Sequence, residues 1–275
     1  MESPDAGGTP CSLGNAATAI SWKLWIYTNY DCNLSCSYCL AESGPRAARR
    51  GLSLATVRRA VDEAVALGFE RVLLTGGEPF LLDDIYAMLA YASERMPTTV
   101  LTNAMLLRGR RLARLDEIAN PNLTVQVSLD GARPEHHDPV RGLGTWTQAV
   151  EGIRLLRQHG FHVHIGTTET SVNAAHLDEL GAFLCSLGIP QEDAISRPVV
   201  QRGFATQGLE VGRDTLTPEL TLTEAGVFWH PLASPSSEDM QVCSQIFPLS
   251  AAVARVQQEL VTLDQDAKGQ QRTVT

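Results

Sequence analysis

No stretch of this sequence is both long and apolar enough to cross a bilayer, and no basic start precedes an apolar segment as in a signal peptide. Basic residues are also few: 22 lysines and arginines stand against 31 aspartates and glutamates, a formal net charge of −9. Because a phosphate backbone is bound by clustered basic residues, nucleic acid is not an expected partner. We therefore predict a cytoplasmic protein with no membrane partner. The acidic balance is compatible with a cationic substrate, although a solvated acidic surface explains it as well.

Cysteine is scarce, with six residues in a chain of 275. Without an export signal, these cysteines are better explained as metal ligands and free thiols than as a disulfide framework. Three stand close together, whereas Cys11, Cys185 and Cys243 are scattered along the chain. Because an all-cysteine iron–sulfur cluster takes four thiolates, the scattered three are not expected to hold one. We expect one metal centre, at the close group.

The middle of the chain alternates strand patterns with helix patterns. The expected strands cover residues 22–28, 71–74, 98–102, 123–129, 161–167 and 194–200. The helices expected between and after them lie near residues 53–67, from about residue 82, and near residues 107–118, 147–158, 174–187 and 249–263. Ser53 is the expected N-cap of the first helix. Alternation of this kind implies a parallel sheet with helices packed against it.

Two of the expected strands indicate how the sheet curves. In residues 123–130 and 161–165, apolar and polar side chains alternate, so each strand has one apolar and one polar face. A flat doubly wound sheet would bury both faces, whereas a barrel can keep a polar lumen for a ligand. We predict an α/β fold with these parts: a flexible leader (1–21), a partial (β/α)6 barrel (22–200) and a small C-terminal extension with a hairpin and a final helix (201–275).

The three close cysteines follow the first expected strand. Cys32, Cys36 and Cys39 have the spacing C-x3-C-x2-C, and no further cysteine or histidine occurs before His136. Thiolates suit zinc and iron–sulfur clusters, but structural zinc takes four closed ligands. A [4Fe–4S] cluster on three thiolates leaves one iron open to a further ligand. A zinc knuckle or a chance grouping are the alternatives.

This loop resembles the signature of the radical S-adenosylmethionine (SAM) superfamily, in which an aromatic residue precedes the last cysteine, here Tyr38. The resemblance implies that one [4Fe–4S] cluster binds SAM and cleaves it reductively to a 5′-deoxyadenosyl radical, which abstracts hydrogen from a substrate. It also implies an external electron donor of the flavodoxin or ferredoxin type. A non-catalytic iron–sulfur carrier or sensor would explain the cysteines, but not the motifs that follow.

Further motifs of the same family stand where strands are expected to end. The glycine pair and its neighbours, Gly76, Gly77, Glu78 and Pro79, resemble the motif that contacts the SAM amino group. Glycine allows a close backbone approach, and a carboxylate accepts from an ammonium. Polar residues after the next two strands, Asn103, Ser128 and Asp130, are by resemblance candidates for the SAM ribose and carboxylate. A tight turn and ordinary polar strand ends are the alternatives.

Residues 127–173 resemble the branch that contains sulfatase-maturating enzymes and the pyrroloquinoline quinone and mycofactocin maturases. That branch usually carries a SPASM or twitch extension with cysteines for auxiliary clusters, and this chain lacks them. Without a second cluster to accept an electron, a redox-neutral outcome such as epimerisation is favoured. Epimerisation needs a hydrogen donor, and we hypothesise that Cys243 is that donor.

Four polar residues, Gln126, His162, His164 and Arg197, are expected to face the lumen and orient a polar substrate. A structural role is the alternative for the two histidines. We predict a small polar, amino sugar-like natural product as the substrate. The alternative is radical modification of a ribosomal peptide, a reaction for which the chain shows no leader-binding domain before its first strand.

Overall fold

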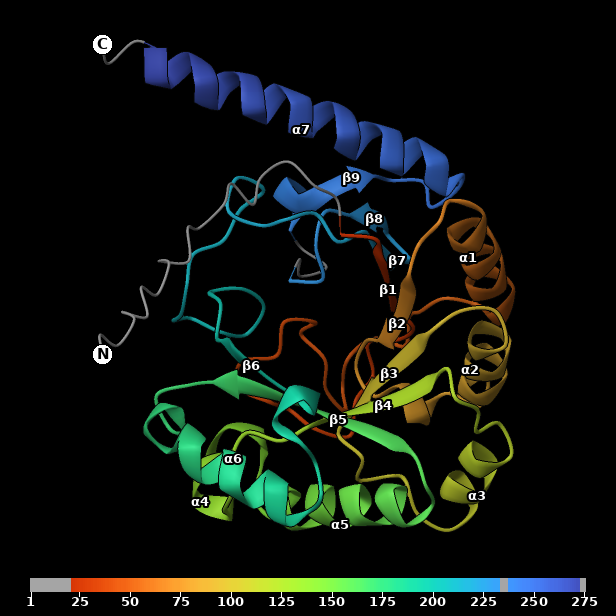
Figure 1. Ribbon diagram of the computed structural model, residues 1–275, viewed down its shortest axis with the longest axis vertical. Helices are drawn as coiled ribbons and strands as arrows, with labels where there is room; N and C mark the ends of the chain where they lie inside the picture. Colours follow the sequence, from red (N-terminus) through yellow and green to blue (C-terminus); the bar gives the residue numbers. More distant parts are fainter. Residues whose placement is uncertain (1–20, 233–236, 273–275) are drawn as a thin grey trace, which may run out of the picture.

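The computed structural model describes residues 21–232 and 237–272, so residues 1–20 of the expected leader lie outside the described part. Its centre is a curved sheet whose first six strands are parallel (Figure 1). These are β1 (Lys23–Tyr27), β2 (Arg71–Thr75), β3 (Thr98–Thr102), β4 (Leu123–Ser128), β5 (His162–Glu169) and β6 (Ala194–Pro198). They neighbour one another in chain order, and the described sheet does not close on itself. The predicted partial barrel is confirmed.

Helices cover the outer face of the sheet (Figure 1). They are α1 (Leu54–Ala66), α2 (Ile85–Ser93), α3 (Arg110–Asp116), α4 (Pro134–Arg141), α5 (Thr145–Gln158) and α6 (Leu177–Ser186). Helix α1 begins where expected, since the Ser53 side chain accepts a hydrogen bond from the Thr56 amide and so satisfies one of the first-turn donors. Helix α4 was not predicted: it is short, mostly polar and contains Pro139, so it has little of the apolar periodicity that marks a helix.

The two faces of the sheet differ as the alternation predicted. In β4, Val125 and Val127 are fully buried and belong to the core between sheet and helices. The intervening Gln126 and Ser128 lie on the inner face, where both line a cavity. Burying the apolar rows against the helices stabilises the layer by about 25 cal/mol for each Å² removed from water. The curvature then leaves the polar row around an interior space.

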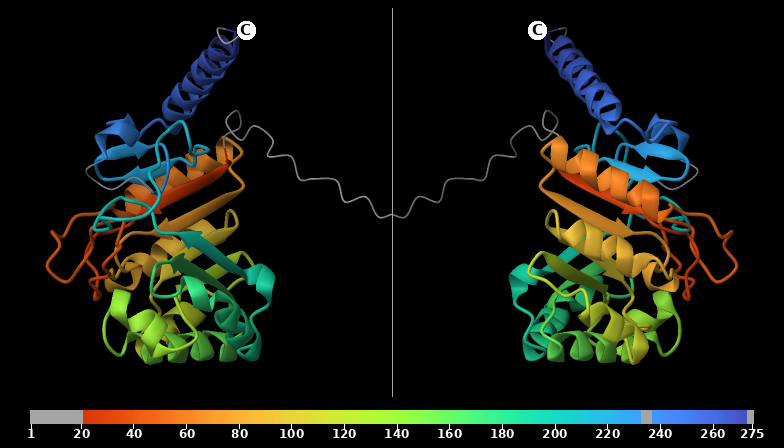
Figure 2. Two further views of the ribbon diagram at one scale, coloured as in Figure 1. Left: turned by 90° about the vertical axis from the view of Figure 1, so that its left-hand side faces the viewer. Right: turned by 90° about the vertical axis from the view of Figure 1, so that its right-hand side faces the viewer.

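The chain after β6 adds three short strands to the same sheet. Strand β7 (Thr221–Thr223) pairs in parallel with β1, and β8 (Gly226–Phe228) and β9 (Gln241–Cys243) follow antiparallel. The predicted hairpin is β7–β8, and the predicted final helix is α7 (Leu249–Arg272), which lies at the end of the molecule away from α5 (Figure 2). Because the three strands continue the main sheet, a domain boundary at residue 200 stays a prediction. No helix in the described part combines the length and apolarity that a membrane crossing would require.

Candidate active site

The three close cysteines lie in one cavity at the carboxyl ends of the parallel strands. The loop between β1 and α1 brings Cys32, Cys36 and Cys39 to the wall of this space of about 320 Å³. Cys32 is buried, and the other two thiols are half-buried. Burial raises the pKa of Cys32 to about 12 and also raises the pKa of Cys36. Such thiols become thiolates when a positive metal centre balances their charge, so this trio fits the iron of a cluster.

The glycine pair after β2 packs against the segment that leads into Cys32. A Cβ atom on Gly76 would lie 2.3 Å from the carbonyl oxygen of Asn29, and one on Gly77 would lie 2.1 Å from that of Asp31. The Gly77 amide donates to the Asn29 carbonyl at 2.8 Å. Both glycines also line the cavity. The close backbone approach that we predicted for these glycines therefore occurs against the cysteine loop.

Glu78, in contrast, is fully buried and does not line the cavity. Its carboxylate accepts from the Thr102 hydroxyl at 2.8 Å, from the Asn103 amide at 2.9 Å and from the Phe80 amide at 3.1 Å. Burial raises the pKa of Glu78 to about 7. Its oxygens already have three donors, so within the structure the carboxylate holds the end of β3 in place. Pro79 is buried beside it, at the start of a short 3-10 turn.

Asn103 is the residue that Glu78 holds, and it lines the cavity. Its side-chain amide donates to the Asn33 side chain at 2.8 Å, which joins β3 to the cysteine loop. Ser128 at the end of β4 also lines the cavity. The structure thus brings Asn103 and Ser128 to the same space as the three thiols.

Asp130 is placed differently from its expected position. Its side chain is fully buried and is absent from the cavity lining. It accepts from the Arg141 Nε at 2.6 Å, from the Thr168 amide at 2.9 Å and from the Tyr38 hydroxyl. Tyr38 and Arg141 do line the cavity. Asp130 therefore fixes the positions of two cavity residues without lining the cavity itself. One of them, Tyr38, lies between Cys36 and Cys39 in the sequence.

The predicted substrate residues separate into two groups. Gln126 and Arg197 line the cavity. His162 and His164 share the inner face of β5 with Gly166, but they lie at its amino end and are not among the lining residues. Their role in orienting a substrate stays a prediction, and in the structure both rings pair with Asp193.

Cys243 lies on β9, three strands beyond β1 in the sheet order, and is absent from the cavity lining. The Arg255 guanidinium of α7 contacts its sulfur at 3.6 Å. The hydrogen-donor role stays a prediction, and it requires Cys243 to reach a substrate from outside the cavity. Cys185 is exposed on α6, and Cys11 lies outside the described residues.

Several further residues line the cavity, beyond those singled out above. Arg141 comes from α4, and Thr167 and Thr168 end β5. Glu219 and His230 come from the segment around β7 and β8. The Trp25 indole donates to the Glu219 carboxylate at 2.6 Å, and burial lowers the pKa of His230 to about 4. Only the pairing of β7 with β1 brings these last two side chains to the cavity, and no local pattern announces that pairing.

Curated relatives share the part of the chain that carries this cavity. The mycofactocin maturase MftC of Mycolicibacterium smegmatis is 32% identical over 176 residues, which are 63% of this chain and 43% of that protein. The AdoMet-dependent heme synthase of Oleidesulfovibrio alaskensis is 29% identical over 181 residues, 65% of this chain and 46% of that protein. The subtilosin biosynthesis protein AlbA of Bacillus subtilis is 30% identical over 159 residues, which are 57% of this chain and 35% of that protein. The chain thus spans less than half the length of these relatives.

Solved structures show the same fold. Streptococcus suis SuiB bound to S-adenosylmethionine superposes with a TM-score of 0.60 at 20% identity, over 70% of this chain and 44% of that one. The protein anSMEcpe with bound AdoMet gives a TM-score of 0.53 at 17% identity, over 64% of this chain and 52% of that one.

The sequence profile of the Radical SAM superfamily matches residues 26–180, more than half of the chain. This range runs from the end of β1 into α6 and contains the three cavity cysteines and the glycine pair. The superfamily uses a [4Fe–4S] cluster and SAM, and the relatives that match belong to its SPASM and twitch-type branch, as the sequence indicated. The chain belongs to the radical SAM superfamily.

Proposed function

We propose that this radical SAM enzyme modifies a peptide, and that Cys32, Cys36 and Cys39 hold its cluster. When bound, the cluster supplies the electron that cleaves SAM to a 5′-deoxyadenosyl radical, which then removes hydrogen from the substrate. The remaining cavity residues bind and orient the reactants. An external flavodoxin- or ferredoxin-type electron donor stays part of the proposal.

The chain's own residues have distinct positions in this scheme. Asn103 and Ser128 present an amide and a hydroxyl to the cavity, which suits the polar groups of SAM. The Arg141 guanidinium, aimed by Asp130, adds a positive charge to the same wall. Tyr38, also bonded to Asp130, fixes the loop between the second and third thiols. The two contacts with Asp130 fix the side chains that would face the reactants.

The observation that carries the peptide proposal is that the cavity reaches an edge strand of the sheet. Its lining includes residues 197–200, on and just after β6. Among the described strands β6 pairs only with β5, and residues 195–198 are exposed. An extended peptide can pair with such a strand edge through its backbone while one side chain enters the adjoining pocket. Leu209 already pairs with the segment at Val199 and Val200, so the edge available to a peptide is residues 195–198.

Relatives support the same substrate class. AlbA is named for the biosynthesis of an antilisterial bacteriocin, and MftC is named as a maturase. SuiB has been solved with its precursor peptide SuiA, and anSMEcpe with a cysteine-containing peptide. These names favour a peptide over the amino sugar-like substrate that the sequence alone suggested.

A small cationic substrate and an epimerisation remain the second proposal, because one observation favours them. The Glu219 carboxylate reaches the cavity wall and suits an ammonium group. In that reaction Cys243 would return the hydrogen atom. Because Cys243 is not among the residues that line the cavity, its position argues against this second proposal.

The test uses the anaerobically reconstituted enzyme with SAM, dithionite and synthetic peptides from short reading frames beside its gene, run in deuterated water. We expect 5′-deoxyadenosine together with a peptide of altered mass, both lost in Cys36→Ala. A peptide that gains solvent deuterium without other change indicates epimerisation. Turnover of amino sugars with no peptide change would overturn the peptide proposal, and an intact cluster that never cleaves SAM would indicate an electron carrier.

A further inference from the structure

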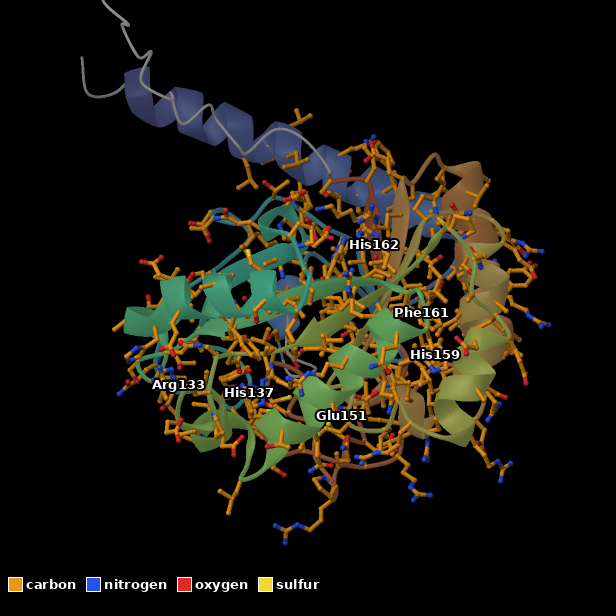
Figure 3. The ribbon with its side chains drawn as sticks, turned by 60° about the horizontal axis from the view of Figure 1, so that its bottom comes forward. Arg133, His137, Glu151, His159, Phe161 and His162 are labelled. Atoms are coloured by element: carbon orange, nitrogen blue, oxygen red, sulfur yellow. The ribbon has the colours of Figure 1, made fainter. Side chains whose placement is uncertain are left out.

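A second group of metal-binding side chains lies away from the cavity, near the amino end of β5. His162 and His164 are two positions apart on this strand, so their rings lie on the same face (His162 is labelled in Figure 3). Asp193 ends the 3-10 turn Gln191–Asp193, directly before β6. The strand pair β5–β6 therefore brings two imidazoles and a carboxylate together.

The three side chains converge on one point. The His162 Nε2 lies 3.1 Å from one oxygen of Asp193, and the His164 Nε2 lies 3.1 Å from the other. The two rings are nearly perpendicular, at 86°, with centroids 4.6 Å apart. A tetrahedral ion with bonds of about 2.0–2.2 Å keeps its ligand atoms roughly 3.4 Å apart. The ligand atoms of the three side chains all lie within 4.8 Å of one another, so closing in on that spacing would bring them onto one ion.

The surroundings suit such an ion. The His162 side chain is 55% exposed, whereas those of His164 and Asp193 are 17% and 15% exposed. Water can therefore supply a fourth ligand from the open side. Two histidines and a carboxylate form a ligand set that zinc takes in proteins.

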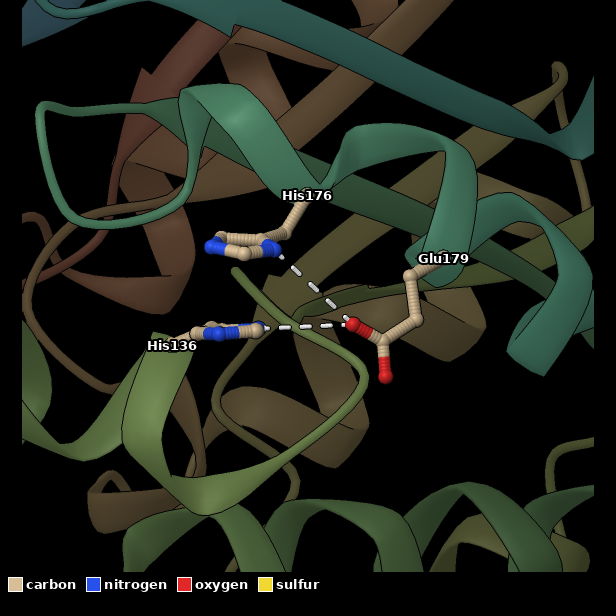
Figure 4. Close-up of side chains that lie close together, drawn as sticks. All are labelled: His136, His176 and Glu179. Carbon is tan, nitrogen blue, oxygen red and sulfur yellow. Dashed lines mark ion pairs between the residues drawn. The ribbon is translucent and has the colours of Figure 1, made fainter.

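A second trio of such side chains has a geometry that does not suit a shared metal ion. His136, His176 and Glu179 also lie close together (Figure 4). Their imidazole rings are stacked, with centroids 3.8 Å apart and an angle of 13°. A metal lies in the plane of an imidazole that binds it, so two parallel rings cannot share an ion without turning. Arg133 also pairs with the Glu179 carboxylate. This trio is a matched control.

We propose that His162, His164 and Asp193 bind a divalent metal ion of the zinc class. The ion joins the start of β6 to β5 at the point where the edge strand begins. Strand β6 carries Arg197 into the cavity wall, and β5 is its only partner among the described strands. A metal at this position would hold that wall in register. The site is independent of the radical reaction and of the substrate proposed above.

The test is zinc binding by the full chain with its cluster reconstituted, because cluster-free thiols would bind zinc themselves. Equilibrium dialysis against zinc, with iron measured alongside, should give one equivalent that does not displace iron. His162→Ala and Asp193→Ala should each weaken zinc affinity roughly tenfold or more. His136→Ala should bind as the wild type does.

Thermal unfolding gives a second readout, since an ion that binds only the folded state raises the melting temperature. Zinc should raise it for the wild type and for His136→Ala, but not for Asp193→Ala. His162→Ala removes an exposed ring and keeps the test valid where a buried substitution fails to fold. Equal zinc affinity in the wild type and both site variants would overturn the proposal. So would zinc that binds only when iron is lost.

Discussion

Replacing Asp130 with Asn should destabilise the protein more than any exposed carboxylate substitution. Asp130 is fully buried, and the Arg141 side chain that it pairs with is 9% exposed. Asn keeps the shape and can still accept from the Thr168 amide. It removes the negative charge and can turn a second donor toward the Arg141 guanidinium. The variant therefore leaves a buried cation without its counter-charge.

The expected magnitude follows from that unpaired charge. Removing one partner of a buried ion pair costs about 3–5 kcal/mol, because the remaining ion has lost its water and its partner. The loss of the Tyr38 contact adds in the same direction. Most of this cost should disappear in the double variant that combines Asp130→Asn with Arg141→Met, because the second substitution removes the unpaired positive charge. The double variant should therefore be more stable than the single one.

Urea unfolding of the reconstituted protein, followed by tryptophan fluorescence, measures these differences. Asp83→Asn is the matched control, because Asp83 is fully exposed and lies 3.9 Å from Arg114. That change should cost less than about 1 kcal/mol. An Asp130→Asn variant within 1 kcal/mol of the wild type would refute the reasoning. So would a double variant that is less stable than Asp130→Asn.

Three further outcomes are expected. Gly77→Ala should lower iron incorporation and the free energy of unfolding, the latter by about 1–3 kcal/mol, because the added Cβ meets the Asp31 backbone. Gly181→Ala should change neither, since the space around its Cβ is open. Thr102→Val should cost about 1–3 kcal/mol in urea unfolding, since Glu78 loses a buried donor; an unchanged midpoint would contradict this. Burial lowers the pKa of His137 to about 4, so as the pH falls the unfolded chain binds the proton before the folded protein does. The free energy of unfolding should therefore fall by up to about 3 kcal/mol between pH 6.5 and pH 4. His137→Asn should flatten that slope, and an unchanged slope would argue against it.

The parallel part of the fold was predictable because its signals are local. Strands β4 and β5 each have an apolar and a polar face, and each of β1 to β5 is followed by at least one helix before the next strand. The N-cap at Ser53 and the inner-face position of Gln126 follow from the same short-range patterns. Chain order then gives the sheet order directly, since strands joined by a helix lie side by side.

The C-terminal strands could not be placed in that way. The hairpin was visible from its turn, but its partner strand is β1, which lies about two hundred residues earlier. The register Trp25↔Thr221 is set by packing between distant segments. Glu219 and His230 reach the cavity only through this pairing. Helix α4 was missed because its polar composition hides it, and with it the role of Arg141.

The two motif carboxylates show the limit of arguing from a residue's chemistry alone. Glu78 and Asp130 both stand beside residues that line the cavity, and a carboxylate in such a position suggests contact with a cofactor. Each is instead fully buried and already accepts from three donors. A buried carboxylate held by three donors fixes the position of its neighbours, and direct contact of Glu78 or Asp130 with SAM stays a prediction. Substituting either one should therefore disturb cluster and SAM binding through Asn103 or Tyr38, the side chains that those carboxylates hold.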